Sequence, residues 1–288
     1  MSGLSVVVAA FSGAQALSRC LDSLTAQSEV TEVVVACADA GAATVTAGLA
    51  RVQLREAPAG ANVFELRSLG VAAAQGDRVA LTEDHCVANP GWAGALLDAH
   101  AAGHAIVGGP VEAAAGLSSY LRALHLCEYI EHLPPLPDGP AAILSGLNVS
   151  YRRHALERCR ETWRRAFYEN EVHDALRKEG IPLHRACRAI VTARLAFPPA
   201  QAARHLLAGG RRYGARRAAD STAARRLLLR LLAPAVPMLL LTRLFLTLAR
   251  RRPGWLPLAL AALPHEIALV GAWSLGEGLG YWSRRETR

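Results

Sequence analysis

The sequence predicts an α/β protein in which a mostly parallel sheet is flanked by helices, followed by a hydrophobic helical segment that associates with a membrane. Short β-branched runs alternate with apolar residues at helical spacing through residues 1–200, which is typical of a parallel sheet covered on both faces. Beyond residue 200, long apolar runs are bordered by arginines. The 288 residues are 52% hydrophobic and 19% charged, which is enough apolar mass for a buried core and excludes a disordered chain.

The first strand is predicted at Leu4–Ala10, a β-branched run that ends at residues 11–13. Apolar residues then recur at helical spacing through residues 16–24, so a helix follows. Further strands are predicted at Glu32–Ala36 and Arg78–Leu81. Ligands bind at the carboxyl ends of strands in such sheets, so the residues that follow these three strands are candidates for a binding site.

The middle of the chain continues the alternation. A helical stretch at Leu117–Glu131 leads into the proline-rich loop Leu133–Pro140, which is either a lid over a site or a surface connector. A helix at Glu171–Glu179 stops at a glycine, and Arg188–Thr192 is predicted as another strand. The expected organisation is a globular domain at 1–200, an arginine-rich amphipathic linker at 201–230 and two hydrophobic helices at 231–288.

The six cysteines lie at positions 20, 37, 86, 127, 159 and 187, and none forms a CxxC pair. This spacing fits neither a zinc site nor a secreted disulfide framework, so reduced thiols in a cytosolic compartment are expected. The N-terminus lacks basic residues followed by a long apolar region, so we expect no cleaved signal peptide.

Charge is distributed unevenly along the chain. The formal net charge is +8, but residues 1–150 carry 6 Arg and 14 Asp or Glu, whereas residues 151–288 carry 26 Lys or Arg and 10 Asp or Glu. The arginine clusters border apolar runs, which favours an anionic membrane surface as a partner. No nucleic acid partner is expected, because the N-terminal part is acidic and no helix-turn-helix or RNA-binding motif is present.

Two apolar runs, Leu231–Ala249 and Trp255–Tyr281, dominate the C-terminal part. As a helix the first run spans about 28 Å, close to the ~30 Å hydrocarbon core of a bilayer. Two spans would place Arg250–Arg252 across the membrane from Arg225-Arg226 and Arg284-Arg285, against the positive-inside bias. Helices lying in the interface keep all three clusters on one side, and we favour this arrangement over spanning helices or buried core helices.

Three consecutive potential metal ligands, Glu83, Asp84 and His85, follow the strand that begins at Arg78. Acids placed directly after a strand can hold a divalent cation while phosphate oxygens of a substrate complete its shell. The imidazole shifts the preference towards Mn²⁺ among the first-row metals. The alternative is that Glu83 and Asp84 only cap the next helix.

Several short motifs accompany these ligands in a particular order. In chain order they are Arg67-Ser68-Leu69-Gly70, Ala74-Gln75-Gly76-Asp77, the Glu83-Asp84-His85 triplet, Pro90-Gly91-Trp92, Val107–Val111, Ser145–Arg153, Phe167–Val172 and Gly210–Arg217. Together they resemble the family 2 glycosyltransferases of the GT-A type over about residues 3–215. The resemblance is to the bacterial branch that builds polysaccharides and lipid-linked glycans and carries membrane-associated C-terminal helices.

The resemblance implies a GT-A domain that transfers a sugar from a nucleotide diphosphate donor, with inversion, to a lipid-linked or polysaccharide acceptor at the cytoplasmic face of the membrane. It implies that Mn²⁺ or Mg²⁺, held by Asp84 and His85, assists the departure of the diphosphate. The residues that it places on the nucleotide sugar are Ala10, Phe11, Asp39, Arg67, Glu83 and Asp84. Those that it places on the acceptor side are Asn148, Arg211 and Arg212.

The family places an acidic pair before a helix near the acceptor, and this chain has Glu169-Asn170 there. Asn cannot accept a proton, so the role of base passes to Glu169, which we favour, or to Glu171. A cationic His173 would help to keep the base ionised. Alternatively, both glutamates only favour the positive N-terminus of their helix. Asp39 also lies a residue or two away from the position where the family has the acid that contacts the base and ribose. Together with Asn170, this leaves a second function open, a catalytically inactive nucleotide-binding or scaffold protein of a glycan assembly complex.

Overall fold

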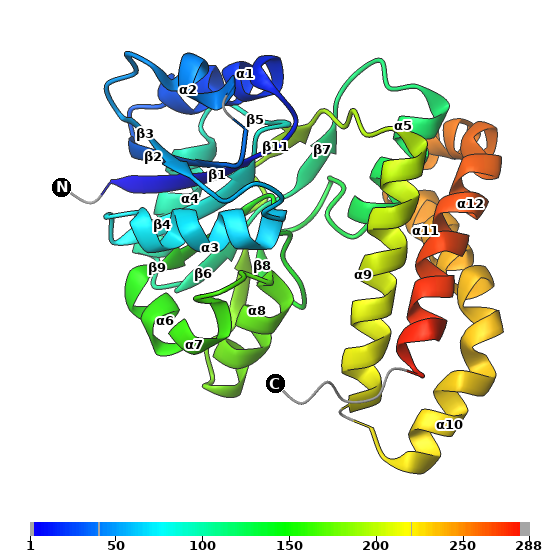
Figure 1. Ribbon diagram of the computed structural model, residues 1–288. Coiled ribbons are helices and arrows are strands. Elements are labelled where there is room, and N and C mark those ends of the chain that lie inside the picture. Colours follow the sequence, from blue (N-terminus) through cyan, green and yellow to red (C-terminus); the bar gives the residue numbers. More distant parts are fainter. Residues whose placement is uncertain (1–2, 40, 220, 283–288) are drawn as a thin grey trace. The chain divides into compact units, whose positions relative to one another are not determined.

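The computed structural model describes residues 3–39, 41–219 and 221–282. The chain forms two compact units, one of Met1–Ala114 with His132–Arg194 and one of Ala115–Glu131 with Leu195–Arg288 (Figure 1). The expected boundary near residue 200 therefore lies close to one of the observed ones. Residues 115–131 were expected in the first domain but group with the C-terminal helices, because their helix packs against the last helix of the chain.

The first unit is built on an eight-stranded sheet with the order β3-β2-β1-β4-β9-β6-β10-β8. The strands β1, β2, β3 and β4 are parallel, as predicted, whereas β9 is antiparallel to both β4 and β6 and β8 is antiparallel to β10. The sheet is therefore mixed, with a parallel half that contains the predicted strands. The bounds are β1 Leu4–Ala10, β2 Val30–Cys37, β3 Val52–Glu56, β4 Arg78–Glu83, β6 Ile106–Gly108, β8 Gly139–Ala141, β9 Val149–Arg152 and β10 Leu183–Arg185.

Helices cover this sheet on both faces. The helices of the unit are α1 Ala14–Thr25, α2 Gly41–Thr46, α3 Val63–Ala73, α4 Trp92–Ala101, α6 Arg153–Arg158, α7 Arg160–Trp163 and α8 Glu169–Lys178. One core cluster joins the sheet residues Val7, Val79 and Tyr151 to Val71 of α3 and Val172 of α8. Helices α1 and α2 lie on the side of the sheet opposite α3 (Figure 1). The expected α/β class with helices on both faces is confirmed.

A second, three-stranded sheet completes the first unit. It consists of β5 (Cys86–Ala88), β11 (Val191–Ala193) and β7 (Val111–Ala113), with β11 antiparallel to β5 and parallel to β7. Only two residues separate β4 from β5, so Asp84 and His85 form the turn that connects the two sheets.

The second unit is helical. Its elements are α5 Ser119–Tyr129, α9 Pro199–Ala219, α10 Ala223–Leu232, η1 Ala233–Ala235, α11 Val236–Arg251, η2 Pro253–Trp255 and α12 Leu256–Gly280. Helix α12 packs against α5, α9 and α11. The expected linker at 201–230 is thus mostly helix, and most of it is the long α9.

Glycines allow α9 and α12 to approach closely. A Cβ atom on Gly210 would overlap the carbonyl oxygen of Trp273, and one on Gly276 would overlap that of Leu207. At one end of this contact Arg217 of α9 forms an ion pair with the buried Glu277 of α12 at 3.0 Å. The Gly210–Arg217 motif therefore serves, in part, to pack two helices.

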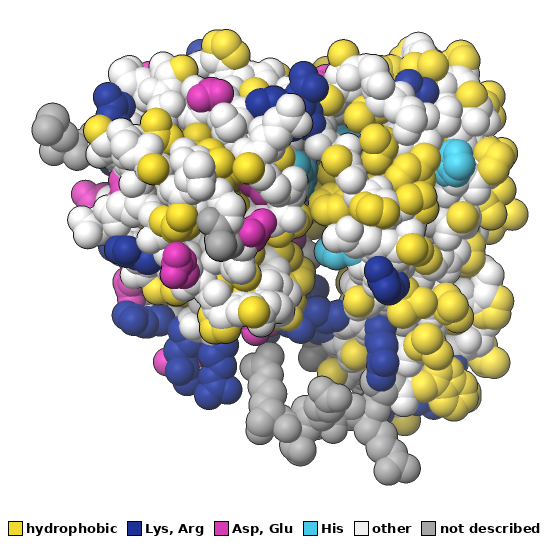
Figure 2. Space-filling model, turned by 45° about the horizontal axis from the view of Figure 1, so that its top comes forward, with side chains coloured by type: hydrophobic (Ala, Val, Ile, Leu, Met, Phe, Trp, Pro, Cys, Tyr) yellow, Lys and Arg dark blue, Asp and Glu magenta, His cyan; other side chains and the backbone are white. Residues whose placement is uncertain are grey.

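Two segments of this unit are long and apolar enough to cross a membrane, Ala223–Arg251 with 29 residues and Pro253–Gly280 with 28. Within the structure, 11% of the apolar window of the first segment and 33% of that of the second are buried. Figure 2 shows hydrophobic side chains spread over the surface of the helical unit. Residues 283–288, the end of the predicted second hydrophobic segment, lie outside the described residues.

Candidate active site

The carboxyl ends of the parallel strands form a pocket in the first unit. In register, Ala9 of β1 lies between Ala36 of β2 and Glu83 of β4, so the residues after these three strands converge. The pocket is lined by Ala10, Phe11, Gly13, Ala14, Leu17, Cys37, Asp39, Ala42 and Asp84. The structure thus brings together four residues that the resemblance placed on the nucleotide sugar: Ala10, Phe11, Asp39 and Asp84.

Asp84 fastens the loop after β1 to the end of β4. The backbone N–H groups of Phe11 and Ser12 donate to its Oδ2 at 2.8 and 2.6 Å. Its Oδ1 is buried and accepts no hydrogen bond from the described residues. Burial raises the pKa of Asp84 above its ordinary value, and the hydrogen bonds from Ser12 and Phe11 oppose this rise. Oδ2 of Asp84 therefore has a structural role, whereas Oδ1 is available to bind a ligand.

His85 lies beside both acids of its motif. Its Nδ1 is 3.6 Å from Oε2 of Glu83 and 4.0 Å from Oδ1 of Asp84, and its ring meets that of Phe11 edge-on. The alternative that Glu83 and Asp84 cap the next helix is wrong, because α4 begins only at Trp92.

A divalent cation fits this turn with help from a substrate. Within the described residues no group of three or more His, Cys, Asp or Glu side chains is arranged to hold a metal ion. The buried Oδ1 of Asp84, next to the imidazole of His85, is however the kind of donor that a Mg²⁺ or Mn²⁺ ion takes from a protein when phosphate oxygens supply further ligands.

Arg67 of α3 joins the metal motif to the predicted base. Its Nη2 donates to Oε1 of Glu83, and its Nη1 donates to Oε2 of Glu169 at 2.8 Å. The guanidinium is buried, and Gly146 is pressed against it so closely that a Cβ atom there would overlap Nη1. Arg67 was expected on the phosphates of the donor. In the structure Arg67 bridges two carboxylates, because tertiary folding brings Glu83 and Glu169 to its two sides, and its contact with the donor stays a prediction.

The two candidate bases lie in the first turn of α8. Glu169 is the first residue of the helix, and 21% of its side chain is exposed, so it faces both Arg67 and solvent. Glu171 is two positions further on and therefore does not share that side of the helix. Asn170 between them is exposed. The geometry favours Glu169 over Glu171.

His173 does not supply a positive charge beside Glu169. His173 is buried in α8, and burial lowers its pKa from 6.5 to about 3, so the ring is neutral at physiological pH. Its Nε2 forms a 2.8 Å hydrogen bond with the hydroxyl of Tyr151, whose pKa burial raises well above the ordinary value. The cation beside Glu169 is Arg67.

The predicted acceptor residues lie in different places. Asn148 is fully buried, its Oδ1 accepts from Trp92 Nε1, and its Nδ2 donates to the carbonyl oxygens of Pro110 and Ala189. An acceptor-binding role for Asn148 is therefore corrected to a structural one. Arg211 and Arg212 are exposed on α9 in the second unit, and their role remains a prediction.

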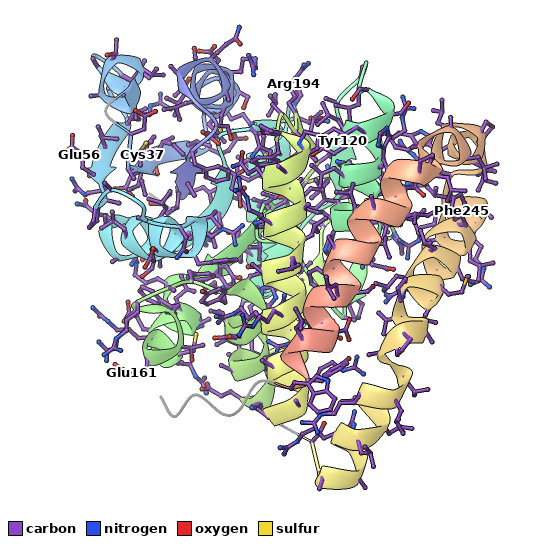
Figure 3. All side chains as sticks on the ribbon, turned by 45° about the vertical axis from the view of Figure 1, so that its right-hand side comes forward. Cys37, Glu56, Tyr120, Glu161, Arg194 and Phe245 are labelled. Atoms are coloured by element: carbon purple, nitrogen blue, oxygen red, sulfur yellow. The ribbon has the colours of Figure 1, made fainter. Side chains whose placement is uncertain are left out.

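Sequence reasoning missed Arg194, which follows β11. Its backbone N–H donates to the carbonyl oxygen of His85 at 2.8 Å, so its backbone lies directly beside the metal motif. Arg194 is labelled in Figure 3. No motif pointed to this residue, because its position depends on the pairing of β11 with β5, which are about 100 residues apart in the chain.

Comparisons with known proteins agree with this fold. The family model for glycosyl transferase family 2 matches residues 5–160. No curated protein sequence matches the chain significantly. Among solved structures, the mannosyltransferase PcManGT from Pyrobaculum calidifontis, in complex with GDP-Man and Mn²⁺, is similar with a TM-score of 0.58 and 15% identity, covering 97% of this chain and 87% of that one.

TarS 1-349 from S. aureus, in complex with UDP-GlcNAc, is similar with a TM-score of 0.52 and 13% identity, covering 96% of this chain and 90% of that one. At these identities the solved structures establish a common fold, while the family model covers more than half of the 288 residues. The chain belongs to glycosyl transferase family 2 and is a glycosyltransferase.

Proposed function

We propose that the chain transfers a sugar from a nucleoside diphosphate donor to a hydroxyl of a lipid-linked or polysaccharide acceptor, with inversion, at the cytoplasmic face of the membrane. The observation that carries the proposal is the bridge through Arg67, which connects Glu83 of the metal motif to Glu169. Through this bridge the motif proposed to bind the donor is held next to Glu169, a partly exposed carboxylate that can accept a proton.

The pocket at the ends of β1, β2 and β4 is the proposed site of the nucleotide. Asp39 and Phe11 line it, and the oxygen of Asp84 that is not engaged by backbone N–H groups lies next to it. Asp84 and His85 would hold a Mn²⁺ or Mg²⁺ ion there, which supplies positive charge to the leaving diphosphate. The complexes of the two similar structures with GDP-Man and UDP-GlcNAc support a nucleoside diphosphate sugar as donor but favour neither nucleotide.

Glu169 is the proposed base. In an inverting transfer the acceptor hydroxyl attacks the sugar from the side opposite the leaving diphosphate, and a base on that side takes its proton. Arg67 occupies Oε2 of Glu169 and so fixes the orientation of the carboxylate. The partial exposure of Glu169 leaves room for an acceptor hydroxyl to reach it.

The helical unit is the proposed membrane-binding part. Leu231 and Met238 are 69% and 70% exposed, and Arg225, Arg226 and the cluster 250–252 flank the apolar segment at its two ends. An apolar surface between clusters of arginine suits a helix that lies in the interface of an anionic bilayer. Arg211 and Arg212 are proposed to contact anionic groups of the acceptor or of the lipid.

The function is tested with the purified full-length chain and a panel of nucleoside diphosphate sugars in the presence of Mn²⁺. Release of the nucleoside diphosphate from one of them supports the proposal. Nucleotide binding without any turnover, in the presence of membrane extract as the acceptor source, would instead favour the inactive nucleotide-binding alternative. Flotation with anionic and with neutral lipid vesicles tests the membrane part, and binding to anionic vesicles is expected to weaken in Leu231→Asp.

A further inference from the structure

The pairing of β11 with β5 places Arg194 opposite His85. Ala193 pairs with Cys86 in antiparallel register, and the next backbone hydrogen bond runs from Arg194 N–H to the carbonyl oxygen of His85. The backbone of Arg194 therefore lies beside that of His85 at the end of the small sheet. The side chain of His85 is buried, whereas that of Arg194 is exposed.

The Arg194 guanidinium is not committed to a carboxylate. Within the described residues it makes no ion pair and no side-chain hydrogen bond. Arg188, in the loop just before β11, differs in this respect, because it pairs with Asp98 at 3.2 Å. The two acids of the neighbouring metal motif have other partners, since Glu83 accepts from Arg67 and Oδ2 of Asp84 accepts from two backbone N–H groups.

We propose that Arg194 binds the diphosphate of the donor, an inference that rests on the proposed function. A planar guanidinium can donate two parallel hydrogen bonds to a phosphate group. The described residues around Glu83-Asp84-His85 offer fewer than three protein ligands for a metal ion. A second positive charge would therefore help to neutralise the diphosphate there. Arg194 would supply this charge from the position directly after β11, where its backbone N–H bonds to the carbonyl oxygen of His85.

The charge matters during the transfer. The bond between the anomeric carbon and the phosphate oxygen breaks, and its electron pair stays on that oxygen, while the acceptor oxygen forms the new bond and its proton passes to Glu169. The leaving diphosphate gains negative charge in this step, and a fixed guanidinium stabilises it.

The test is calorimetric binding of ADP, GDP and UDP to the full chain with Mn²⁺, followed by the monophosphate of the best-bound base. Arg194→Ala is expected to weaken diphosphate binding about tenfold or more, since a hydrogen bond to a charged group is worth roughly that factor. Monophosphate binding is expected to change less than about twofold, because the lost contact is to the second phosphate. Arg194→Lys should restore part of the loss, and the matched control Arg188→Ala should bind as the wild type does.

The outcomes separate this inference from the proposed function. If the wild-type chain binds no nucleoside diphosphate, the proposed function fails and the inference fails with it. If the wild type binds but Arg194→Ala binds equally well, or loses diphosphate and monophosphate affinity equally, only the role of Arg194 is overturned. The backbone, not the side chain, of Arg194 bonds to His85, so the variant is expected to fold, and an unchanged melting temperature verifies this.

Discussion

Arg67 donates a hydrogen bond to Oε2 of Glu169 at 2.8 Å, across 102 positions of the sequence. The same guanidinium donates to Glu83 at the end of β4, so one buried cation is shared by two carboxylates of different predicted roles. Buried ionic groups are tolerated only when each is paired. The bridge therefore fixes the distance between the donor motif and the base.

Replacement of Arg67 is expected to destabilise the first unit. Arg67→Ala leaves the buried Glu83 without its cation, and loss of one partner of a buried pair costs about 3–5 kcal/mol. Arg67→Lys keeps the charge but cannot reach both carboxylates with a planar fork, so an intermediate loss is expected. Chemical denaturation measures both values, and a cost below about 1 kcal/mol for Arg67→Ala, the level of a surface pair, would contradict the account.

Asp84→Asn separates the two roles of that side chain. The amide oxygen can still accept the N–H groups of Phe11 and Ser12, while the amide nitrogen replaces the oxygen that is free for a cation. We expect nearly unchanged stability together with loss of the stimulation of activity by Mn²⁺. Both proteins are first stripped of metal with EDTA, and their activity is then measured as Mn²⁺ is added. An Asp84→Asn variant with the metal response of the wild type would exclude Asp84 as a ligand.

Two buried histidines predict loss of stability in acid. Burial lowers the pKa of His100 from 6.5 to about 4 and that of His173 from 6.5 to about 3. As pH falls below about 6.5, the unfolded chain binds protons that the folded chain does not, so the free energy of unfolding falls with pH, by about 2 kcal/mol per histidine between pH 7.5 and pH 5.

The matched variant for this prediction is His173→Gln, whose amide oxygen can still accept from the hydroxyl of Tyr151. Its melting temperature is expected to depend less on pH than that of the wild type over this range. Other titrating groups contribute equally to both proteins, so parallel pH profiles would refute the neutral, buried state of His173.

Two glycines of α12 provide a matched pair for the packing of the helical unit. A Cβ atom on Gly276 overlaps the carbonyl oxygen of Leu207, whereas one on Gly271 has nothing within 4 Å. Gly276→Ala is expected to destabilise by about 1–3 kcal/mol through overpacking, while Gly271→Ala gains up to about 1 kcal/mol in helix stability. Thermal unfolding followed by circular dichroism compares the two variants, and equal effects would disprove the close contact of α9 with α12.

The predicted strands of the parallel half were accurate because each is a local apolar run. Leu4–Ala10 coincides with β1, and Glu32–Ala36 and Arg78–Leu81 lie inside β2 and β4. The strand β3 was missed because its residues are only half-buried or exposed at the edge of the sheet, so its sequence lacks a continuous apolar run. Predicted Arg188–Thr192 overlaps β11 only in part.

The candidate site was predictable on the donor side and not around the base. Ala10 ends β1, and Asp39 and Asp84 follow β2 and β4, so the family resemblance and the rule that ligands bind at strand ends both pointed to them. The partners of Arg67 and the burial of His173 depend on contacts between distant segments, which a linear pattern does not contain.

The most direct measurement of the central claim compares Glu169→Gln with the wild type and with Glu171→Gln in steady-state transfer from the donor that the wild type uses. Loss of a general base reduces kcat by about 10²–10⁴. The account predicts this loss for Glu169→Gln at an unchanged melting temperature, and an effect below about tenfold for Glu171→Gln. Wild-type kcat in a folded Glu169→Gln protein would contradict it.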